Sequence, residues 1–161
     1  MQNPAPVDDL LEELTGFATA VAQLPLSSMT NWAQRPTPDQ WSLTEVMCHL
    51  RDVEREVHQV RFRALLFEDG AFIAGAVPDD WTEQRRYSQE DGVAAREQFL
   101  RARQETADLL ANLTNEQWQR AGNHAFFGRT TLHELLNLVI QHDKAHWQQI
   151  VTLVAAHPHS H

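Results

Sequence analysis

The stretch TLHELLNLVIQHDKAHWQQIVTLVA, residues 131–155, decides the fold of this chain. Its apolar residues recur every three or four positions, which is the period of an amphipathic α-helix. They form one stripe that is centred on Val139 and includes Leu132, Leu135, Leu136, Ile150, Leu153 and Val154. The pattern predicts a long helix that begins near Thr130 or Thr131, ends near Ala156 and packs this stripe against other helices.

Two histidines, His142 and His146, lie on the core-facing side of the same predicted helix. On a helical wheel, His146 is about 20° and His142 about 60° from the centre of the apolar stripe. Residues four apart are one helical turn apart, which is close enough for two imidazoles to share a metal ion. A buried imidazole without a partner costs about 1–3 kcal/mol, so the pair needs either a common ion or separate hydrogen bonds.

A third histidine lies on another predicted helix, which begins after Ser42. Ser42 and Glu45 form the capping-box pattern of a helix start. An apolar stripe follows, with Val46, Leu50, Val53, Val57, Val60 and Ala64. His49 is about 60° from Val46, at the edge of that stripe. A lone core histidine is more commonly hydrogen-bonded than metal-bound, but three together favour a metal site. Three imidazoles leave a tetrahedral ion one open position, as catalytic sites do.

The rest of the chain predicts two more helices, at about residues 7–24 and 88–113, and a short turn at 114–118. Residues 25–40 and 122–128 are predicted to be loops, and no segment shows the alternation of a strand. Four helices without strands predict an all-α four-helix bundle, and the long loops predict at least one crossover connection. We expect one domain over residues 1–156 and a disordered tail, HPHSH, at 157–161.

The composition of the chain indicates which binding partners and which cellular compartment to expect. The chain has 13 basic and 22 acidic residues and a net charge of −9, so nucleic-acid binding is not expected. No apolar run approaches the roughly 20 residues that span a bilayer, and the acidic N-terminal stretch does not resemble a signal peptide. The single cysteine, Cys48, is expected to be a buried, inert thiol. The chain is therefore predicted to be cytoplasmic, without a membrane partner.

Two segments resemble the DinB/YfiT-like superfamily. WSLTEVMCHLRDVE, which contains Trp41 and His49, is similar to the family's second-helix motif. HAFFGRTTLHELLNLVIQHDKAHWQQI, which contains the other two histidines, is similar to its last-helix motif. The resemblance implies an up-down-down-up bundle that is often a homodimer. It also implies that His49, His142 and His146 bind one divalent metal ion, zinc or nickel in most relatives.

The resemblance further implies activity on a small-molecule substrate. The leading expectation is a metal-dependent transferase that activates a low-molecular-weight thiol for attack on a small electrophile. The alternatives are a metal-dependent hydrolase that uses metal-bound water and a non-catalytic metal- or ligand-binding module of a stress response. A fourth protein ligand, for which Glu45 is the first candidate, would favour the last alternative.

Three residues near the predicted triad have roles that the sequence leaves open. Glu45 is either a catalytic residue, as a general base or a hydrogen-bond partner of His49, or only part of the capping box. Asp143 either orients an imidazole or pairs with an arginine on another helix. His58 has no partner at ligand spacing on the core-facing side.

Overall fold

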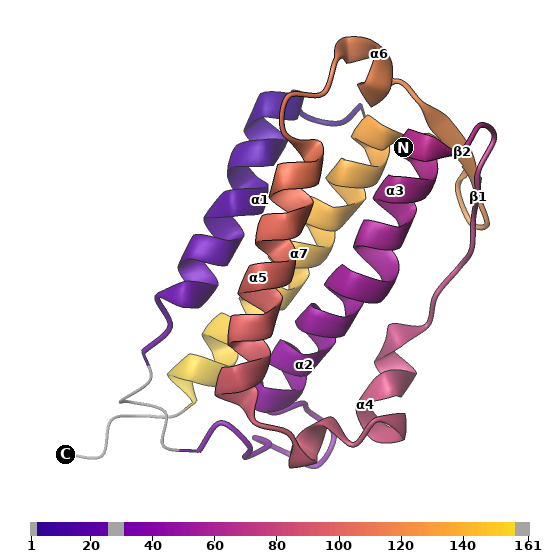
Figure 1. Ribbon diagram of the computed structural model, residues 1–161. Helices are drawn as coiled ribbons and strands as arrows, with labels where there is room; N and C mark the ends of the chain where they lie inside the picture. The colour runs from indigo at the N-terminus through magenta and orange to yellow at the C-terminus, as the bar shows by residue number, and fades with distance from the viewer. Residues whose placement is uncertain (1–2, 26–30, 157–161) are drawn as a thin grey trace.

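A computed structural model describes residues 3–25 and 31–156, so the predicted tail at 157–161 lies outside the described residues. The long helices are α1 (Val7–Ala22), α2 (Leu43–Val53), α5 (Gly92–Leu110) and α7 (Leu132–Ala155); α2 continues without a break through η1 (Glu54–His58) and α3 (Gln59–Phe67). Figure 1 shows that α2–α3 and α5 run in one direction and α1 and α7 in the other. The predicted four-helix bundle is therefore confirmed, with the up-down-down-up order of helix directions.

The connection between α3 and α5 is the predicted crossover, because it returns along the length of the bundle (Figure 1). It contains β1 (Phe72–Ile73), η2 (Pro78–Asp80), α4 (Trp81–Gln84) and η3 (Tyr87–Gln89). α6 (Asn115–Trp118) is the predicted short turn between α5 and α7. Among the described residues, no helix is both long and apolar enough to cross a membrane.

Side-chain caps fix where the functional helices begin. Ser42 accepts a hydrogen bond from the Glu45 amide, and the Glu45 carboxylate accepts one from the Ser42 amide, as the capping box predicted. Thr131 and Glu134 form the same arrangement at the start of α7. Each cap satisfies amides that a helix cannot bond internally. The caps therefore set the register in which the histidines face the core.

The hydrophobic core consists of two clusters at opposite ends of the bundle. One contains Phe17, Met47, Phe99 and Ile150, and the other contains Leu14, Phe62, Leu65, Leu110 and Leu136. Between the two clusters, the middle turns of the helices carry buried polar residues, among them His49, Glu54, His58, Arg103 and Asp143. The bundle is thus apolar at both ends and polar at its waist.

The prediction that residues 122–128 form only a loop was wrong. β2 (Ala121–His124) and β3 (Gly128–Thr131) form an antiparallel hairpin, and β1 pairs with β2 in parallel, so that Phe72 is opposite Asn123. Strands of two to four residues are too short to show a period of two in the sequence. Gly128 supports the turn, because its φ of 68° is in the left-handed region.

The predicted apolar stripe of the second helix also fails after Val57. Val60 is 56% exposed, and Phe62 and Leu65 are buried instead. The reason is the π-helical turn η1, in which one additional residue per turn shifts the face that every later residue presents. The same shift turns His58 toward the core, where a regular α-helix would have directed it to the side.

Candidate metal site

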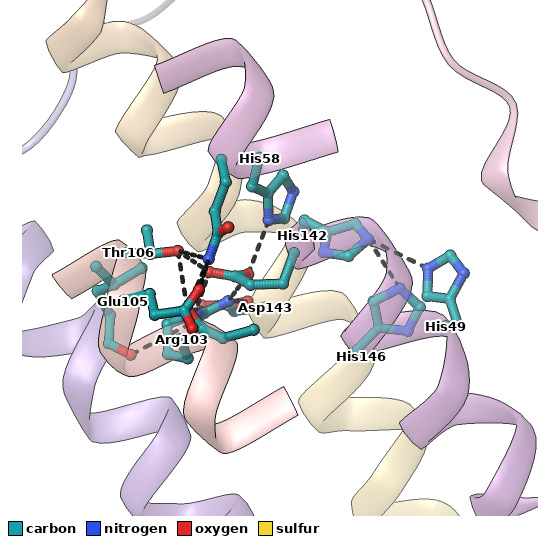
Figure 2. Close-up of polar contacts among 12 residues, drawn as sticks. His49, His58, Arg103, Glu105, Thr106, His142, Asp143 and His146 are labelled. Carbon is teal, nitrogen blue, oxygen red and sulfur yellow. Dashed lines mark hydrogen bonds and ion pairs between the residues drawn. The ribbon is translucent and has the colours of Figure 1, made fainter. Parts of the chain in front are cut away.

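The three predicted ligands, His49, His142 and His146, converge at the waist of the bundle. Nε2 of His142 lies 3.4 Å from Nε2 of His49 and 3.1 Å from Nε2 of His146. One ring nitrogen from each of the three lies within 4.8 Å of the other two. Figure 2 shows the imidazoles pointing toward one another, His49 from α2 and the other two from α7. The structure therefore brings together the residues that the sequence separates by more than ninety positions.

The spacing of these nitrogens fits a tetrahedral ion. Zn–N bonds of about 2.05 Å at tetrahedral angles put two ligand nitrogens about 3.3 Å apart, close to the 3.4 and 3.1 Å found between the imidazoles. Within the described residues, Nδ1 of His49 and Nδ1 of His142 are buried without a hydrogen-bond partner. Neither imidazole is therefore held in place by the ordinary hydrogen bonds of a core histidine. The donor set and its spacing fit a divalent metal of the zinc type.

The protein keeps the three imidazoles neutral, as metal ligation requires. Burial lowers the pKa of His49 to about 3, with a further contribution from neighbouring imidazoles. Burial likewise lowers the pKa of His142 and of His146 below their ordinary values. A neutral imidazole has one nitrogen lone pair free for a metal ion. The site is therefore ready for metal without first losing protons at neutral pH.

Two neighbours hold the ring of His146 in position. Its Nδ1 donates to Oε1 of Gln149 at 2.9 Å, which leaves the lone pair on Nε2. Such a bond fixes the tautomer and the orientation of a metal-binding histidine. Trp41 stacks on the same ring, with an interplanar angle of 7° and a centroid distance of 6.5 Å, and also contacts His49. Neither Gln149 nor the covering role of Trp41 was found from the sequence.

A buried ion cluster lies beside the histidines. Arg103 donates to Glu54 from Nε and Nη2, each at 2.9 Å, and to Asp143 from Nη1 at 2.7 Å and from Nη2 at 2.9 Å. It also donates to the backbone carbonyl of Leu14 on α1. Arg103 thus joins all four long helices. The predicted pairing of Asp143 with an arginine on another helix is confirmed, and Asp143 does not contact the triad nitrogens.

His58 connects the ion cluster with the triad, a role that the sequence did not reveal. Its Nδ1 lies 3.1 Å from Oε2 of Glu54. Its ring lies edge-on to that of His142, with the two ring centroids 5.1 Å apart. Figure 2 shows His58 between the Arg103 cluster and His142. Because a carboxylate accepts, Nδ1 of His58 carries a proton in this contact. The π-helical turn could not be predicted from residue spacing, so the sequence did not indicate that His58 faces the triad.

Glu45 is not one of the converging residues. Its carboxylate accepts hydrogen bonds from Arg35, one of them 2.9 Å from Nε, and from the Ser42 amide at 2.7 Å. Burial alone would raise the pKa of Glu45, but these bonds lower it below its ordinary value. A carboxylate with a low pKa is a weak base near neutral pH. The capping-box interpretation describes its contacts, and a catalytic role for Glu45 stays a prediction.

Cys48 is adjacent to His49 in sequence but does not belong to the site. The thiol is buried, as predicted. Burial, with a contribution from nearby carboxylates, raises the pKa of Cys48 to about 12. A thiol with so high a pKa is protonated and a poor nucleophile near neutral pH, and the converging metal-ligating group does not include Cys48. The prediction of an inert cysteine agrees with these properties.

A cavity opens next to the triad and gives it access to small molecules. Its volume is about 530 Å³, and His142 and His146 are on its lining together with apolar residues such as Val53, Leu135 and Val139. A second cavity, of about 700 Å³, also has His146 on its lining, together with Trp41 and Gln149 among others. Both cavities also have Asp79 on their lining. Cavities of this size match those that bind small ligands.

The lowered pKa values predict metal binding that changes little with mild acid. Histidines of ordinary pKa, near 6.5, protonate below that pH and compete with metal. Because the pKa of His49 is about 3 and those of the other two are lowered, the neutral forms persist below pH 6.5. Zinc affinity, measured by calorimetry on a chain ending at residue 156, should stay within about threefold between pH 7.5 and 5.5. A tenfold or greater loss per pH unit would contradict the burial argument.

The fold and the site together define a four-helix bundle with a three-histidine metal-binding centre. The chain belongs to the DinB superfamily, whose family profile matches residues 7–150. Among solved structures it is similar to YfiT from Bacillus subtilis, with a TM-score of 0.74 and 20% identity over 95% of this chain and 90% of that one. YfiT is described as a probable metal-dependent hydrolase with an unusual four-helix bundle topology. No curated protein matches the sequence significantly.

Proposed function

We propose that this protein is a metal-dependent hydrolase that acts on a small molecule. One observation carries the proposal: three neutral imidazoles converge, two of them, His142 and His146, line a cavity of about 530 Å³, and among the described residues the metal-ligating group contains no fourth side chain. A divalent ion held by three ligands has an open position, where it would polarise a carbonyl and generate a nucleophile from water near neutral pH. Zinc fits the nitrogen spacing.

The protein's own residues support this chemistry in three ways. His49, His142 and His146 bind the ion, and Gln149 orients one of them. Apolar side chains on the cavity lining, such as Val53, Leu135 and Val139, lower the polarity next to the site, which strengthens electrostatic effects there. His58, a residue of the same cavity, adds a further imidazole beside the site, and Glu54 orients its ring by accepting a hydrogen bond from Nδ1.

The proposal predicts ester or amide hydrolysis that depends on the metal. The zinc-loaded chain should hydrolyse members of a panel of small activated esters and amides at 100-fold or more above background, since metal-activated water supplies several kcal/mol. Removing the metal with a chelator should abolish the rate, and adding zinc should restore it. The panel is followed by absorbance with no thiol present. A rate that survives complete metal removal would contradict the proposal.

Thiol transfer is the second candidate, and the two cavities favour it. A transferase has to bring two molecules, a thiol and an electrophile, to one ion. His146 lines two cavities, one of about 530 Å³ and one of about 700 Å³, so two small molecules have room beside it. Thiolate is a good ligand for zinc, and coordination deprotonates a thiol. Adding glutathione or N-acetylcysteine to the same panel separates the candidates: the transferase is inactive without thiol, whereas the hydrolase rate does not change.

A further inference from the structure

Arg61 on α3 is a cation in the metal-site cavity without a carboxylate partner. Its Nη2 donates to the backbone carbonyl of Ala74 at 2.8 Å, and no carboxylate in residues 3–25 and 31–156 lies within ion-pair distance of it. Other arginines near the site are paired with acids: Arg35, Arg51, Arg85 and Arg103. Burial lowers the pKa of Arg61, and no nearby acid offsets that effect. In a chain with a net charge of −9, such an arginine needs an explanation.

His124 on β2 provides a second hydrogen-bond donor on the same lining. Its Nδ1 accepts a hydrogen bond from the Phe126 amide at 3.1 Å, so the ring proton is on Nε2. The side chain is buried, and burial, together with the charge of Arg61, lowers its pKa. His124 is therefore a neutral N–H donor close to a cation. Arginine beside a neutral donor is a suitable pair for an oxyanion, because both groups donate and neither accepts.

The position of Arg61 relates this pair to the metal site. Arg61 follows His58 by three residues, which is one turn and about 4.5 Å along a helix. The His58 ring in turn contacts that of His142. Asp79 is the carboxylate on the lining of this cavity. Asp79 also lines the second cavity, together with Trp41, whereas Arg61 does not line the second cavity. Arg61 and His124 therefore line the first cavity but not the second.

We infer that Arg61 and His124 form an anion subsite, and that the substrate of the metal site is a small organic carboxylate. That the bound carboxylate is a substrate rests on the proposed function, whereas the existence of the anion subsite does not. The carboxylate would lie against Arg61, and the carbon skeleton would fill the apolar cavity toward the triad, past Leu135 and Val139. Bidentate guanidinium–carboxylate pairs are among the stronger polar contacts in proteins.

The test compares benzoate with benzamide, which has nearly the same shape but no charge. Binding of each to the metal-free full-length chain is measured by calorimetry, so that neither metal nor turnover enters the result. Wild type should bind benzoate about tenfold or more tightly than benzamide, because a charge-assisted pair is worth about 1.5–3 kcal/mol. Arg61→Gln should reduce the ratio to near one. Arg63→Gln, which removes an exposed arginine of the same helix, should leave the ratio unchanged.

Further variants keep the inference testable if Arg61→Gln is poorly folded. Arg61→Lys retains the charge but loses the fork geometry, so it should keep part of the preference. His124→Asn retains an acceptor for the Phe126 amide but removes the Nε2 donor. This variant should weaken the binding of benzoate about threefold or more. Equal affinities for benzoate and benzamide in wild type, or equal ratios in Arg61→Gln and Arg63→Gln, would overturn the subsite. Zinc stoichiometry and ester hydrolysis, measured separately, decide the proposed function independently.

Discussion

His142→Ala should lose almost all metal binding, whereas the wild-type chain should bind about one zinc ion. Nε2 of His142 is the central atom of the triad, since it lies within 3.4 Å of Nε2 in both His49 and His146. The variant leaves two imidazole ligands, one from α2 and one from α7. Loss of residues that merely orient a ligand costs 10–100-fold in affinity, so loss of a ligand should cost more than about 100-fold.

The measurement is bound zinc per chain after dialysis, with residues 157–161 removed from every variant because the three histidines in this segment are themselves potential metal ligands. His133→Ala is the matched control, since His133 is on the same helix and hydrogen-bonds to the Ala5 carbonyl, away from the triad. Zinc in excess should also raise the melting temperature of wild type but not of His142→Ala, because a ligand stabilises the state that binds it. Equal metal content in His142→Ala and wild type would show that the triad is not the site.

Arg103→Met should destabilise the fold by about 3–5 kcal/mol, the cost of leaving buried charges without their partner. Glu54 is fully buried and Asp143 is 3% exposed, and both depend on Arg103. Burial alone would raise the pKa of Glu54, but the charge of Arg103 and the contact with His58 hold it well below the ordinary value. Without Arg103, Glu54 must protonate or draw water into the core. A domain of ordinary stability would then be close to unfolding.

Urea denaturation followed by circular dichroism measures this loss. Arg101→Met is the control, because Arg101 is exposed on the same helix and should change stability by less than about 0.5 kcal/mol. The triple variant Glu54→Gln, Arg103→Met, Asp143→Asn leaves no buried charge unpaired and should recover part of the loss. A loss below about 1 kcal/mol in Arg103→Met would mean that the cluster is not what holds the four helices together at the waist.

Local patterns in the sequence were sufficient for the helices and for the inward direction of His49, His142 and His146. A capping box depends on residues three apart, so Ser42 with Glu45 could be recognised before any tertiary contact was known. The stripe around Val139 fixed the face of α7, and with it the inward direction of His142 and His146. Asp143, predicted to pair with an arginine on another helix or to orient an imidazole, pairs with Arg103, but nothing in the sequence identified which arginine.

Other features depended on interactions that the sequence pattern does not contain. The π-helical turn at Glu54–His58 changes the phase of the helix, so extrapolation of an α-helical period wrongly placed Val60 inside and missed His58. The strands β1 to β3 are too short to show a period, and the pairing of β1 with β2 joins segments far apart in the chain.

The sequence by itself determined a four-helix bundle with three inward histidines, because helix periodicity and capping are local properties of the chain. The tertiary structure alone decided that these imidazoles converge within 4.8 Å, that Arg103 joins four helices beside them, and that Arg61 and His124 share their cavity. The physical reason is that convergence depends on how the helices are packed and on the crossover connection. Both are set by contacts between residues distant in sequence, which no local pattern specifies.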